Sequence, residues 1–442
     1  MTEKIEKGEI ISHGKTKEIH SVLGRPNSVI LKNKDEITKN DDKSLTKTMA
    51  SKAEYATATT CMVFQLLKEA GIPVAFESQI SPTEFLAPKC AMIPLEVIIR
   101  RYADGSCLKR SPNLKTGEGQ APHRFHKLVF ELFLKTTEGK FSGKSGNELS
   151  MSNDVLSDND KPVDDPFIAN PYDSTWTLKN PKIPTWDAKS DLGLSVANSD
   201  VLPTGIKLSE IEKITRQVFL ILENAWAQLG CRLIDFKIEF GIDADGNLLV
   251  ADVIDNDSWR LRTADWKELS KQLFRDNFSM EEISEKYALV AKLVERFALP
   301  KQVIVFWRGS EGDALPKYTE VPGVDIVLIV RSGHKSPAMC IDDLEQVLAS
   351  YPQGGVIIAL VGLSNGLGPT LASRTSWPVI SVPASWKEAP HDVWSSLSMP
   401  SNVPTLTVLS VNNAYLAALN ILAPNNGAAY MTRQYIIETF DK

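Results

Sequence analysis

One stretch near the middle of the chain constrains the fold most, because its residues alternate strictly between two chemical types. From 234 to 240, every even-numbered residue is apolar and every odd-numbered residue is charged. A period of two is that of a β-strand with two different faces. Asp245-Gly246 follows, a dipeptide typical of a two-residue hairpin turn. The stretch therefore predicts a β-hairpin.

The predicted hairpin also suggests a metal site. With Asp245 and Gly246 as the turn, Glu239 lies directly opposite Asp252, and two facing carboxylates repel each other unless a cation lies between them. Two hard oxygen ligands suit Mg²⁺ that holds a nucleotide phosphate, which Lys237 on the same face could also reach. The hairpin alone leaves a second interpretation open, a solvated polar face on an edge hairpin.

Composition excludes several classes of protein. The 442 residues suffice for two or three domains, and a net charge of -6 does not suggest nucleic acid or an anionic membrane as a partner. No apolar run approaches a membrane span, and the first residues lack the apolar core of a signal peptide. The five cysteines are widely spaced without a Cys-x-x-Cys pair, which argues against disulfides and zinc. We expect a cytoplasmic protein.

The first 135 residues contain two candidate ligand segments. Residues 8–32 read as β-hairpins, and at their first bend lies Gly14-Lys-Thr-Lys17, where a glycine lets the backbone approach a ligand closely. Residues 49–70 read as a helix that ends at Gly71. The segment 100–110 carries four cations, a glycine and a serine, which suit a polyanionic small molecule. A solvated basic turn is the alternative.

The next part of the chain changes character. Residues 136–205 are polar and lose apolar periodicity, so we expect a long loop or a partly disordered insertion. Apolar residues at helical spacing between 208 and 222 then predict one face of an amphipathic helix, which stops at Gly230. Residues 280–298 predict another helix, which Pro300 ends.

Residues from 301 onward alternate between strands and helices. Four short continuous apolar runs are typical of strands buried on both faces of a parallel sheet: 303–306, 325–330, 356–361 and 378–382. Polar turns follow the first three runs, and ligands of open α/β sheets bind at such carboxyl ends. We therefore expect one domain over residues 1–290, a linker over 291–300 and a second domain over 301–442.

These motifs, in this order, resemble two known families. Residues 10 to about 285 resemble SAICAR synthetase (phosphoribosylaminoimidazole-succinocarboxamide synthase) in four motifs: Gly14-Lys-Thr-Lys17, Arg100-Arg-Tyr-Ala-Asp-Gly-Ser106, Asp235-Phe-Lys-Ile-Glu-Phe-Gly241 and Asp252-Val-Ile-Asp-Asn-Asp-Ser-Trp-Arg-Leu261. Residues 301–442 resemble class II AIR carboxylase in three: Ser332-Gly-His-Lys335, Ser364-Asn-Gly-Leu-Gly-Pro369 and Pro378-Val-Ile-Ser-Val-Pro383. The domain order is that of the bifunctional purine-biosynthesis enzymes of animals.

The resemblance implies a fold and a reaction sequence. It implies an N-terminal α+β domain of ATP-grasp or kinase-like type and a C-terminal Rossmann-like or flavodoxin-like three-layer α/β domain with a parallel sheet. Aminoimidazole ribonucleotide (AIR) would take up CO₂ to give its carboxylate, CAIR, without biotin. CAIR, aspartate and ATP with Mg²⁺ would then give SAICAR, ADP and phosphate. The family also implies a homo-octamer assembled through the carboxylase domain.

The resemblance assigns roles in the synthetase half. Glu239 and Asp252 would bind Mg²⁺, and Lys237 would act on the reacting groups. ATP would be held by residues from the first strands, the adenine hinge and a basic position: Lys15, Lys17, Asp35, Met92 and Lys135. CAIR and aspartate would contact Arg100, Ser106, Asp257, Arg260 and Lys271. Activation by phosphoryl transfer needs a metal and cations rather than a protein nucleophile.

The resemblance also assigns roles to residues of the carboxylase half. His334 would accept the ring proton, while Lys335 and Ser364 would steady the new carboxylate. Backbone N–H groups at Gly362 and Gly366 would face CO₂ or phosphate. Ser310 would hold the phosphate and Asp313 the ribose.

The chain departs from both family patterns. Thr136-Thr137 replaces acidic residues after Lys135, and Asp164-Asp165-Pro166 is a candidate replacement far downstream; Lys39-Asn-Asp-Asp-Lys43 replaces a small-residue loop. In the carboxylase half, the usual Gly-Ser-Thr-Ser-Asp reads Gly309-Ser-Glu-Gly-Asp313, Pro316 and Pro322 interrupt the next helix, and Leu363 replaces an arginine. Two alternatives stay open: an active ligase with a scaffold C-terminal domain, and a phosphotransferase unrelated to purines.

Overall fold

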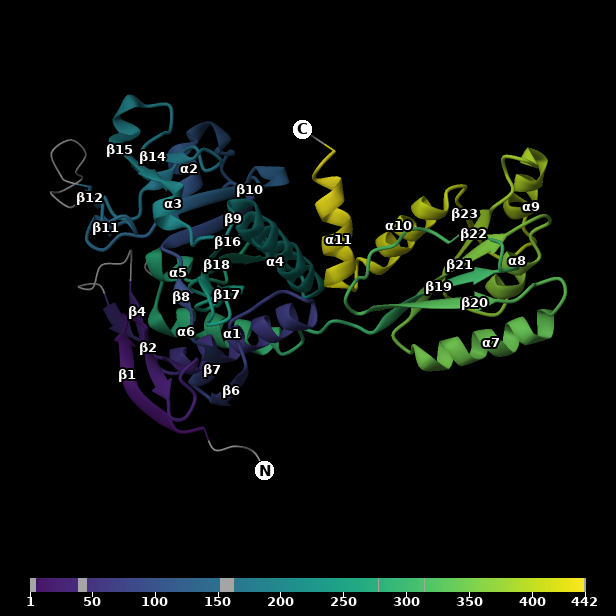
Figure 1. The fold of residues 1–442 in the computed structure, drawn as a ribbon, viewed down its shortest axis with the longest axis horizontal. Coiled ribbons are helices and arrows are strands. Elements are labelled where there is room, and N and C mark those ends of the chain that lie inside the picture. Colours follow the sequence, from purple (N-terminus) through teal and green to yellow (C-terminus); the bar gives the residue numbers. More distant parts are fainter. Residues whose placement is uncertain (1–4, 39–45, 152–162, 277, 314, 441–442) are drawn as a thin grey trace. The chain divides into compact units, whose positions relative to one another are not determined.

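The computed structural model describes residues 5–38, 46–151, 163–276, 278–313 and 315–440. The chain forms two compact units, which divide between Phe297 and Ala298 (Figure 1). The first combines antiparallel sheets with helices, and the second is a parallel α/β unit, so the predicted fold classes are confirmed. No described helix is long and apolar enough to cross a membrane. The altered loop at 39–43 lies outside the described residues.

The first sheet of the N-terminal unit contains the predicted hairpins. Its strand order is β1 (Lys7–His13), β2 (Lys17–Val22), β3 (Ser28–Asn33), β7 (Glu84–Pro88) and β6 (Ser78–Ser81), all antiparallel. Helix α1 (Lys52–Glu69) packs against it through buried aromatic rings, and Gly71 follows with a φ of 76°. The predicted helix and its glycine stop are confirmed. Strands β4 (Glu36–Thr38) and β5 (Thr46–Thr48) form a separate pair.

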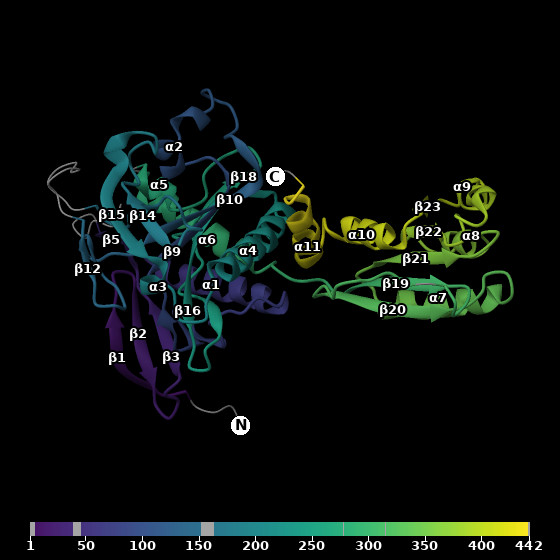
Figure 2. The ribbon, with the colours of Figure 1, turned by 45° about the horizontal axis from the view of Figure 1, so that its top comes forward.

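The second sheet carries most of the candidate site. Its strands are β8 (Ala91–Met92), β9 (Leu95–Tyr102), β10 (Arg124–Leu134), β13 (Phe167–Ile168), β14 (Thr175–Lys179), β15 (Asp191–Ala197), β16 (Cys231–Ile242), β17 (Leu248–Ala251) and β18 (Trp259–Thr263). Helix α4 (Leu208–Gln228) packs on β16 (Figure 2). The Phe219 ring of α4 stacks on Phe236 of β16 at 5.6 Å. Helix α6 (Met280–Val294) begins at a Ser279–Glu282 capping box. The remaining helices are α2 (Ser106–Arg110), α3 (Asn198–Val201) and α5 (Gln272–Arg275).

The organising hairpin forms, but its predicted register is wrong by one residue. Glu239 pairs with Ala251 rather than with Asp252. Asp243 N–H donates to the Asn247 oxygen (3.1 Å), which leaves a three-residue turn with Gly246 at a φ of 85°. A turn one residue longer shifts every pair of the ladder. The interpretation as a solvated edge face is also wrong, because Glu239 is 6% exposed.

The expectation of a loop over residues 136–205 is wrong for the described part of that segment. Strands β13, β14 and β15 extend the large sheet, and β11 (Lys140–Ser142) pairs with β12 (Glu148–Ser150). Trp176 and Leu178 of β14 are fully buried. This alternation covers too few residues to stand out in a polar composition. Residues 152–162 lie outside the described part.

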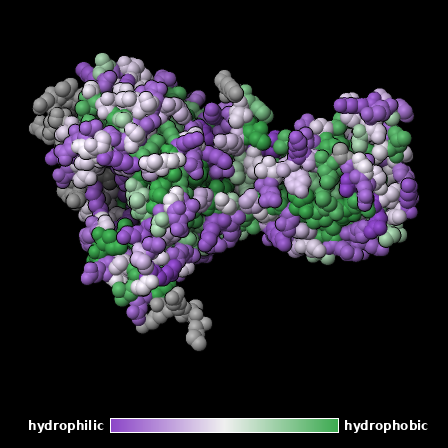
Figure 3. Space-filling view, in the orientation of Figure 1, coloured by the Kyte–Doolittle hydropathy of each residue, from purple (hydrophilic) through white to green (hydrophobic). Residues whose placement is uncertain are grey.

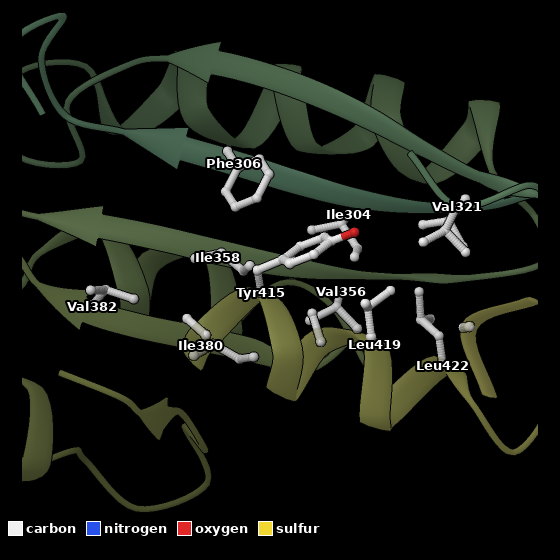
Figure 4. Packing of buried hydrophobic residues seen from close by; sticks show 14 of the residues in the cluster. Ile304, Phe306, Val321, Val356, Ile358, Ile380, Val382, Tyr415, Leu419 and Leu422 are labelled. Carbon is white, nitrogen blue, oxygen red and sulfur yellow. The ribbon is translucent and has the colours of Figure 1, made fainter. Parts of the chain in front are cut away.

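The C-terminal unit is a five-stranded parallel sheet between helices. Its order is β20 (Val324–Val330), β19 (Gln302–Arg308), β21 (Gly355–Val361), β22 (Val379–Pro383) and β23 (Leu406–Thr407), the order of flavodoxin-like sheets. Helices α7 (Pro337–Ser350) and α8 (Leu367–Ala372) cover one face. Helix α10 (Val411–Leu422) covers the other, where Tyr415 lies among sheet side chains (Figure 4). Helices α9 (Trp394–Leu397) and α11 (Gly427–Ile437) complete the unit.

The connection from β19 to β20 has an unusual form. Its described residues, 309–313 and 315–323, contain no helix. Instead the Tyr318 ring stacks on Phe306 at 5.8 Å, and the Tyr415 hydroxyl donates to the Thr319 oxygen (2.6 Å). Strand β20 is consequently not buried on both faces as predicted, because Leu328 is 49% exposed. Hydrophobic side chains also gather on the surface of the C-terminal unit (Figure 3).

Candidate functional site

Lysines and carboxylates alternate where β16 and β17 meet the first bend of the chain. Lys237 Nζ lies 2.7 Å from Glu96 and 3.7 Å from Glu239, and Lys135 Nζ donates to both Glu239 oxygens at 2.8 Å. Lys17 forms an ion pair with Asp252. We call these six residues the lysine–carboxylate cluster. It brings together five residues that the sequence assigned to ATP, metal and catalysis, and it adds Glu96, which the sequence reasoning missed.

Opposite charges offset the cost of burial at Asp252 and at Lys237. Burial opposes ionisation of Asp252, but the charges of Lys17 and Lys237 hold its pKa below the usual value. Burial would also lower the pKa of Lys237, and the neighbouring Glu96 and Glu239 raise it instead. Asp252 has a φ of 65°, a left-handed conformation that costs free energy for any residue with a Cβ and occurs often at functional sites.

The donor set fits a hydrated Mg²⁺ bound to a nucleotide. Among the described residues, no group of three or more His, Cys, Asp or Glu side chains is arranged to hold a metal by itself. Mg²⁺ usually takes only one or two carboxylates and completes its shell with water and phosphate oxygens. Glu239 and Asp252 provide such carboxylates. Their lysine partners provide cations that would face the phosphates.

The downstream Asp-Asp-Pro segment lies beside Lys135, as its proposed replacement role requires. Thr136 N–H donates to Asp165 (2.8 Å), the Thr136 hydroxyl donates to Asp164 (2.8 Å), and Leu134 N–H donates to the Pro166 oxygen (3.0 Å). Burial, together with the charge of Glu96, raises the pKa of Asp165 to about 6. A fourth carboxylate therefore borders the cluster.

Asp257 is the centre of a second buried group. Its carboxylate lies 3.2 Å from Lys52 and 3.1 Å from Lys271, and it accepts a hydrogen bond from the Tyr287 hydroxyl at 2.6 Å. Burial would raise the pKa of Asp257, but the two lysines hold it well below its usual range. The sequence assigned Asp257 and Lys271 to substrate binding and missed Lys52 and Tyr287. Helix α1 also carries Glu54, Lys68 and Glu69, so no local pattern distinguished Lys52 from a surface residue.

The basic segment after β9 is a buried network rather than a solvated turn. Arg100 pairs with Glu131 (2.7 Å) and with Asp235, and donates to the Ser106 hydroxyl at 3.2 Å. Arg260 Nη1 donates to the same Asp235 at 2.7 Å. Arg101 and Arg110 are also buried, so the alternative of a solvated basic turn is wrong.

Arg260 lies close to the backbone of Gly105 and to a further cation, Arg275. Gly105 has a φ of 55°, and a Cβ there would lie 2.0 Å from Arg260 Nη2. Burial lowers the pKa of Arg275 on α5, and the charge of Arg260 lowers it further, so the two guanidinium groups lie close enough to repel. Arg275 was missed, although it follows Lys271 at helical spacing. The concentration of cations favours an anionic ligand here.

Three predicted nucleotide contacts lie outside these groups. Asp35 accepts a hydrogen bond from Ala53 N–H at 2.9 Å, at the start of α1 where Ser51 provides no side-chain cap. Asp35 therefore stabilises the helix start. Lys15 is exposed at the first bend. Met92 of β8 is 46% exposed and pairs with Gly241 of β16.

In the C-terminal unit, two predicted loops meet at the carboxyl edge of the sheet. A Cβ on Gly366 would lie 2.6 Å from His334 Nε2, and a Cβ on Gly333 would lie 2.7 Å from Leu367 Cα. The His334 ring therefore packs on the backbone at the start of α8. Ser364 has a φ of 56°, and its N–H donates to Asp392 at 2.8 Å. The remaining glycine, Gly362, has open space where its Cβ would be.

The loop after β19, residues 309–313, is held by hydrogen bonds between its own residues. Ser310 donates to Asp313 through both its N–H (3.0 Å) and its hydroxyl (3.2 Å). Lys335 N–H donates to the Ser332 hydroxyl at 3.3 Å, and the Lys335 side chain is exposed. These turns follow β19, β20 and β21, which are neighbours in the sheet.

Comparison with known proteins gives matches along most of the chain. The family model described as SAICAR synthetase matches residues 10–148 and 185–292, and the one described as AIR carboxylase matches residues 313–435. The "Probable multifunctional protein ADE2" of Caenorhabditis elegans is 34% identical over 95% of this chain and 90% of its own length. The human "Bifunctional phosphoribosylaminoimidazole carboxylase/phosphoribosylaminoimidazole succinocarboxamide synthetase" is 31% identical, and the match covers 95% of this chain and 91% of the human protein.

Among solved structures, the phosphoribosylaminoimidazole-succinocarboxamide synthase of Ehrlichia chaffeensis is 24% identical and superposes with a TM-score of 0.47. The match covers 65% of this chain and 98% of the Ehrlichia chain.

The first unit gathers charged side chains around β9 and β16, and the second gathers polar turns at the carboxyl ends of its parallel strands. Together they define a two-domain enzyme. The sequence matches extend over both units. The chain belongs to the family of bifunctional phosphoribosylaminoimidazole carboxylase/phosphoribosylaminoimidazole succinocarboxamide synthetases.

Proposed function

We propose that the C-terminal unit carboxylates AIR with CO₂ and that the N-terminal unit joins the CAIR formed to aspartate at the expense of ATP, two successive steps of purine biosynthesis. The lysine–carboxylate cluster carries the proposal for the ligase. Family membership and the contact of His334 with Gly366 support the carboxylase.

The cluster is suited to receive Mg²⁺ and the phosphates of ATP. Glu239 and Asp252 would hold the metal, which supplies charge neutralisation of the phosphate oxygens when bound. Lys17 and Lys135 would exchange their carboxylate partners for phosphate oxygens. Lys237 lies between Glu96 and Glu239, and would stabilise the charge that develops on the transferred phosphoryl group.

The cationic groups beside Gly105 are suited to the anionic parts of CAIR and aspartate. Asp235 accepts hydrogen bonds from both Arg100 and Arg260, which fixes the orientation of their guanidinium planes before a ligand binds. Arg275 and Lys271 add positive charge. A CAIR carboxylate oxygen would take the γ-phosphoryl group, and the aspartate amine would then displace phosphate from the activated carbon.

The carboxylase chemistry requires a proton acceptor at the ring carbon. That carbon forms a bond with CO₂ and must then lose its hydrogen as a proton. His334, held against Gly366, would accept the proton. Lys335 and the Ser364 hydroxyl would stabilise the new carboxylate, and Ser310 and Asp313 would hold the phosphate and ribose.

Separate assays of the two half-reactions test the proposal. The purified protein should take up CO₂ when given AIR alone, and should release ADP when given CAIR, aspartate and Mg²⁺·ATP. ADP release without CO₂ uptake would favour the scaffold alternative for the C-terminal unit. ADP release that depends on neither CAIR nor aspartate would favour an unrelated phosphotransferase.

Two further features are proposed on family membership. The protein would act in the cytoplasm, and it would assemble as a homo-octamer through the C-terminal unit. Sedimentation of the intact chain and of a chain shortened to residues 1–297 would test the assembly. An octamer that survives removal of the second unit would contradict it.

A further inference from the structure

A cation without a counter-ion lies at the carboxyl edge of the parallel sheet. Arg308 is the last residue of β19, between the ends of β20 and β21. Its guanidinium Nη1 donates to the backbone oxygens of Glu311 (2.7 Å) and Asp313 (3.1 Å), and its buried Nε has no hydrogen-bond partner. Within the described part of the chain, Arg308 forms no ion pair. Arg331, at the end of the next strand, is by contrast paired with Asp343 at 2.8 Å.

The loop that Arg308 organises lacks the usual means of binding a phosphate. A loop that leads into a helix presents N–H groups and the positive end of the helix dipole. The described residues between Asp313 and β20 contain no helix, and Ser310 N–H already donates to Asp313. The neighbouring Gly-rich loop, residues 362–369, contains no cation, and its Leu363 is 63% exposed. Among the described residues, these loops therefore offer an anion neither the positive end of a helix that follows β19 nor a cation from residues 362–369.

We propose that Arg308 supplies this positive charge and binds the phosphate of the ribonucleotide in the carboxylase site. The inference rests on the proposed carboxylase function and deepens it. Arg308 projects into the loop Gly309–Asp313, which contains the two residues assigned to the phosphate and ribose. The Arg308 guanidinium donates to two carbonyl oxygens through Nη1 alone, so it keeps the N–H groups of Nη2 for an incoming anion. The end of β19 thus offers a positive charge that the Gly-rich loop itself does not contain.

Steady-state kinetics of CO₂ uptake test the inference. Arg308→Met should raise KM for AIR by about 10- to 100-fold, the loss expected for charged hydrogen bonds, with a much smaller change in kcat. Arg308→Lys should keep KM within a few-fold, because it retains the charge. The matched change Arg331→Met, at the end of the neighbouring strand, should leave KM as in the wild type.

A second variant separates phosphate binding from loop support. Leu363→Arg, added to Arg308→Met, should restore KM for AIR at least in part, since it returns a cation to this edge without restoring the bonds to Glu311 and Asp313. Inorganic phosphate should inhibit the wild type competitively and lose potency in Arg308→Met by a factor similar to the rise in KM.

Three outcomes overturn the inference. An unchanged KM in Arg308→Met contradicts it while leaving the carboxylase function in place. A raised KM that neither Arg308→Lys nor Leu363→Arg restores, with unaltered phosphate inhibition, assigns Arg308 to loop structure alone. A wild-type protein without CO₂ uptake removes the proposed function and the inference together.

Discussion

The imidazole of His334 lies directly against the backbone of Gly366, so that a methyl group on Gly366 would come within 2.6 Å of Nε2. Gly366 has a φ of -90° and a ψ of -25°, which any residue adopts. The glycine is thus required by the close approach of the ring and not by its own backbone.

Gly366→Ala should therefore displace His334 without unfolding the protein. We expect CO₂ uptake from AIR to fall by about 10²-fold or more, because proton transfer depends on the position of the base. The thermal unfolding midpoint should stay within a degree or two. Gly362→Ala is the matched control in the same loop, since a Cβ there has open space and the backbone N–H is kept. Equal losses in both variants would contradict the role of this contact.

Glu239→Gln should disable the ligase half alone. The substitution keeps the shape of the side chain, removes a negative charge from the cluster and weakens the ion pair with Lys135. ADP release with CAIR and aspartate should fall by at least about 10²-fold, and a higher Mg²⁺ concentration should recover part of it. Asp265→Asn, at an exposed ion pair with Lys267, should change nothing measurable. An unaltered Mg²⁺ dependence in Glu239→Gln would rule out metal binding there.

Lys52→Met tests whether the buried group around Asp257 is held by charge. Lys52 is 2% exposed, and removing one partner of a buried ion pair costs about 3 kcal/mol of unfolding free energy. The midpoint of urea unfolding should fall accordingly. Lys52→Met combined with Asp257→Asn should be more stable than Lys52→Met alone, although inactive as a ligase. Additive losses in the double variant would show that the two charges do not interact.

Asp165→Asn tests a pH dependence with a definite sign. Because the pKa of Asp165 in the folded protein, about 6, exceeds its ordinary value of 3.8, the folded state binds more protons than the unfolded state between these pH values. Stability from this group is therefore present at low pH and lost as pH rises to about 6. The variant should be more stable than the wild type at pH 7.5, by at most about 3 kcal/mol, and no more stable at pH 4. A stabilisation that is equal at both pH values would contradict the shifted pKa.

Long periodic segments were predictable from the sequence, and short or turn-dependent features were not. Helices α1, α4 and α6 follow from apolar periodicity over many residues, and four of the five parallel strands follow from continuous apolar runs. The two-residue strand β23 was not predicted. The hairpin register failed because a turn one residue longer moves Glu239 from Asp252 to Ala251. Strand β14 was hidden because only Trp176 and Leu178 mark it in a polar segment.

The candidate site shows the same division. Residues within recognisable motifs, such as Lys237 and Asp257, do lie in charged groups. Lys52 and Arg275 join them through tertiary packing, which no local pattern encodes. The resemblance to known families assigned Asp35 to the nucleotide, which stays a prediction; the sequence did not show that its carboxylate also accepts a hydrogen bond from the start of α1.

His334→Asn separates the two active units of the protein. Asparagine keeps a polar side chain of similar reach but does not accept a proton at neutral pH, so CO₂ addition to AIR should fall by about 10²- to 10⁴-fold. The same variant, given preformed CAIR, aspartate and Mg²⁺·ATP, should make SAICAR at the wild-type rate, because we assign that chemistry to the lysine–carboxylate cluster of the N-terminal unit. A variant that loses both activities would indicate misfolding or coupling between the units, which its unfolding midpoint would distinguish. A variant with full CO₂ uptake would exclude His334 as the base and leave its contact with Gly366 as packing alone.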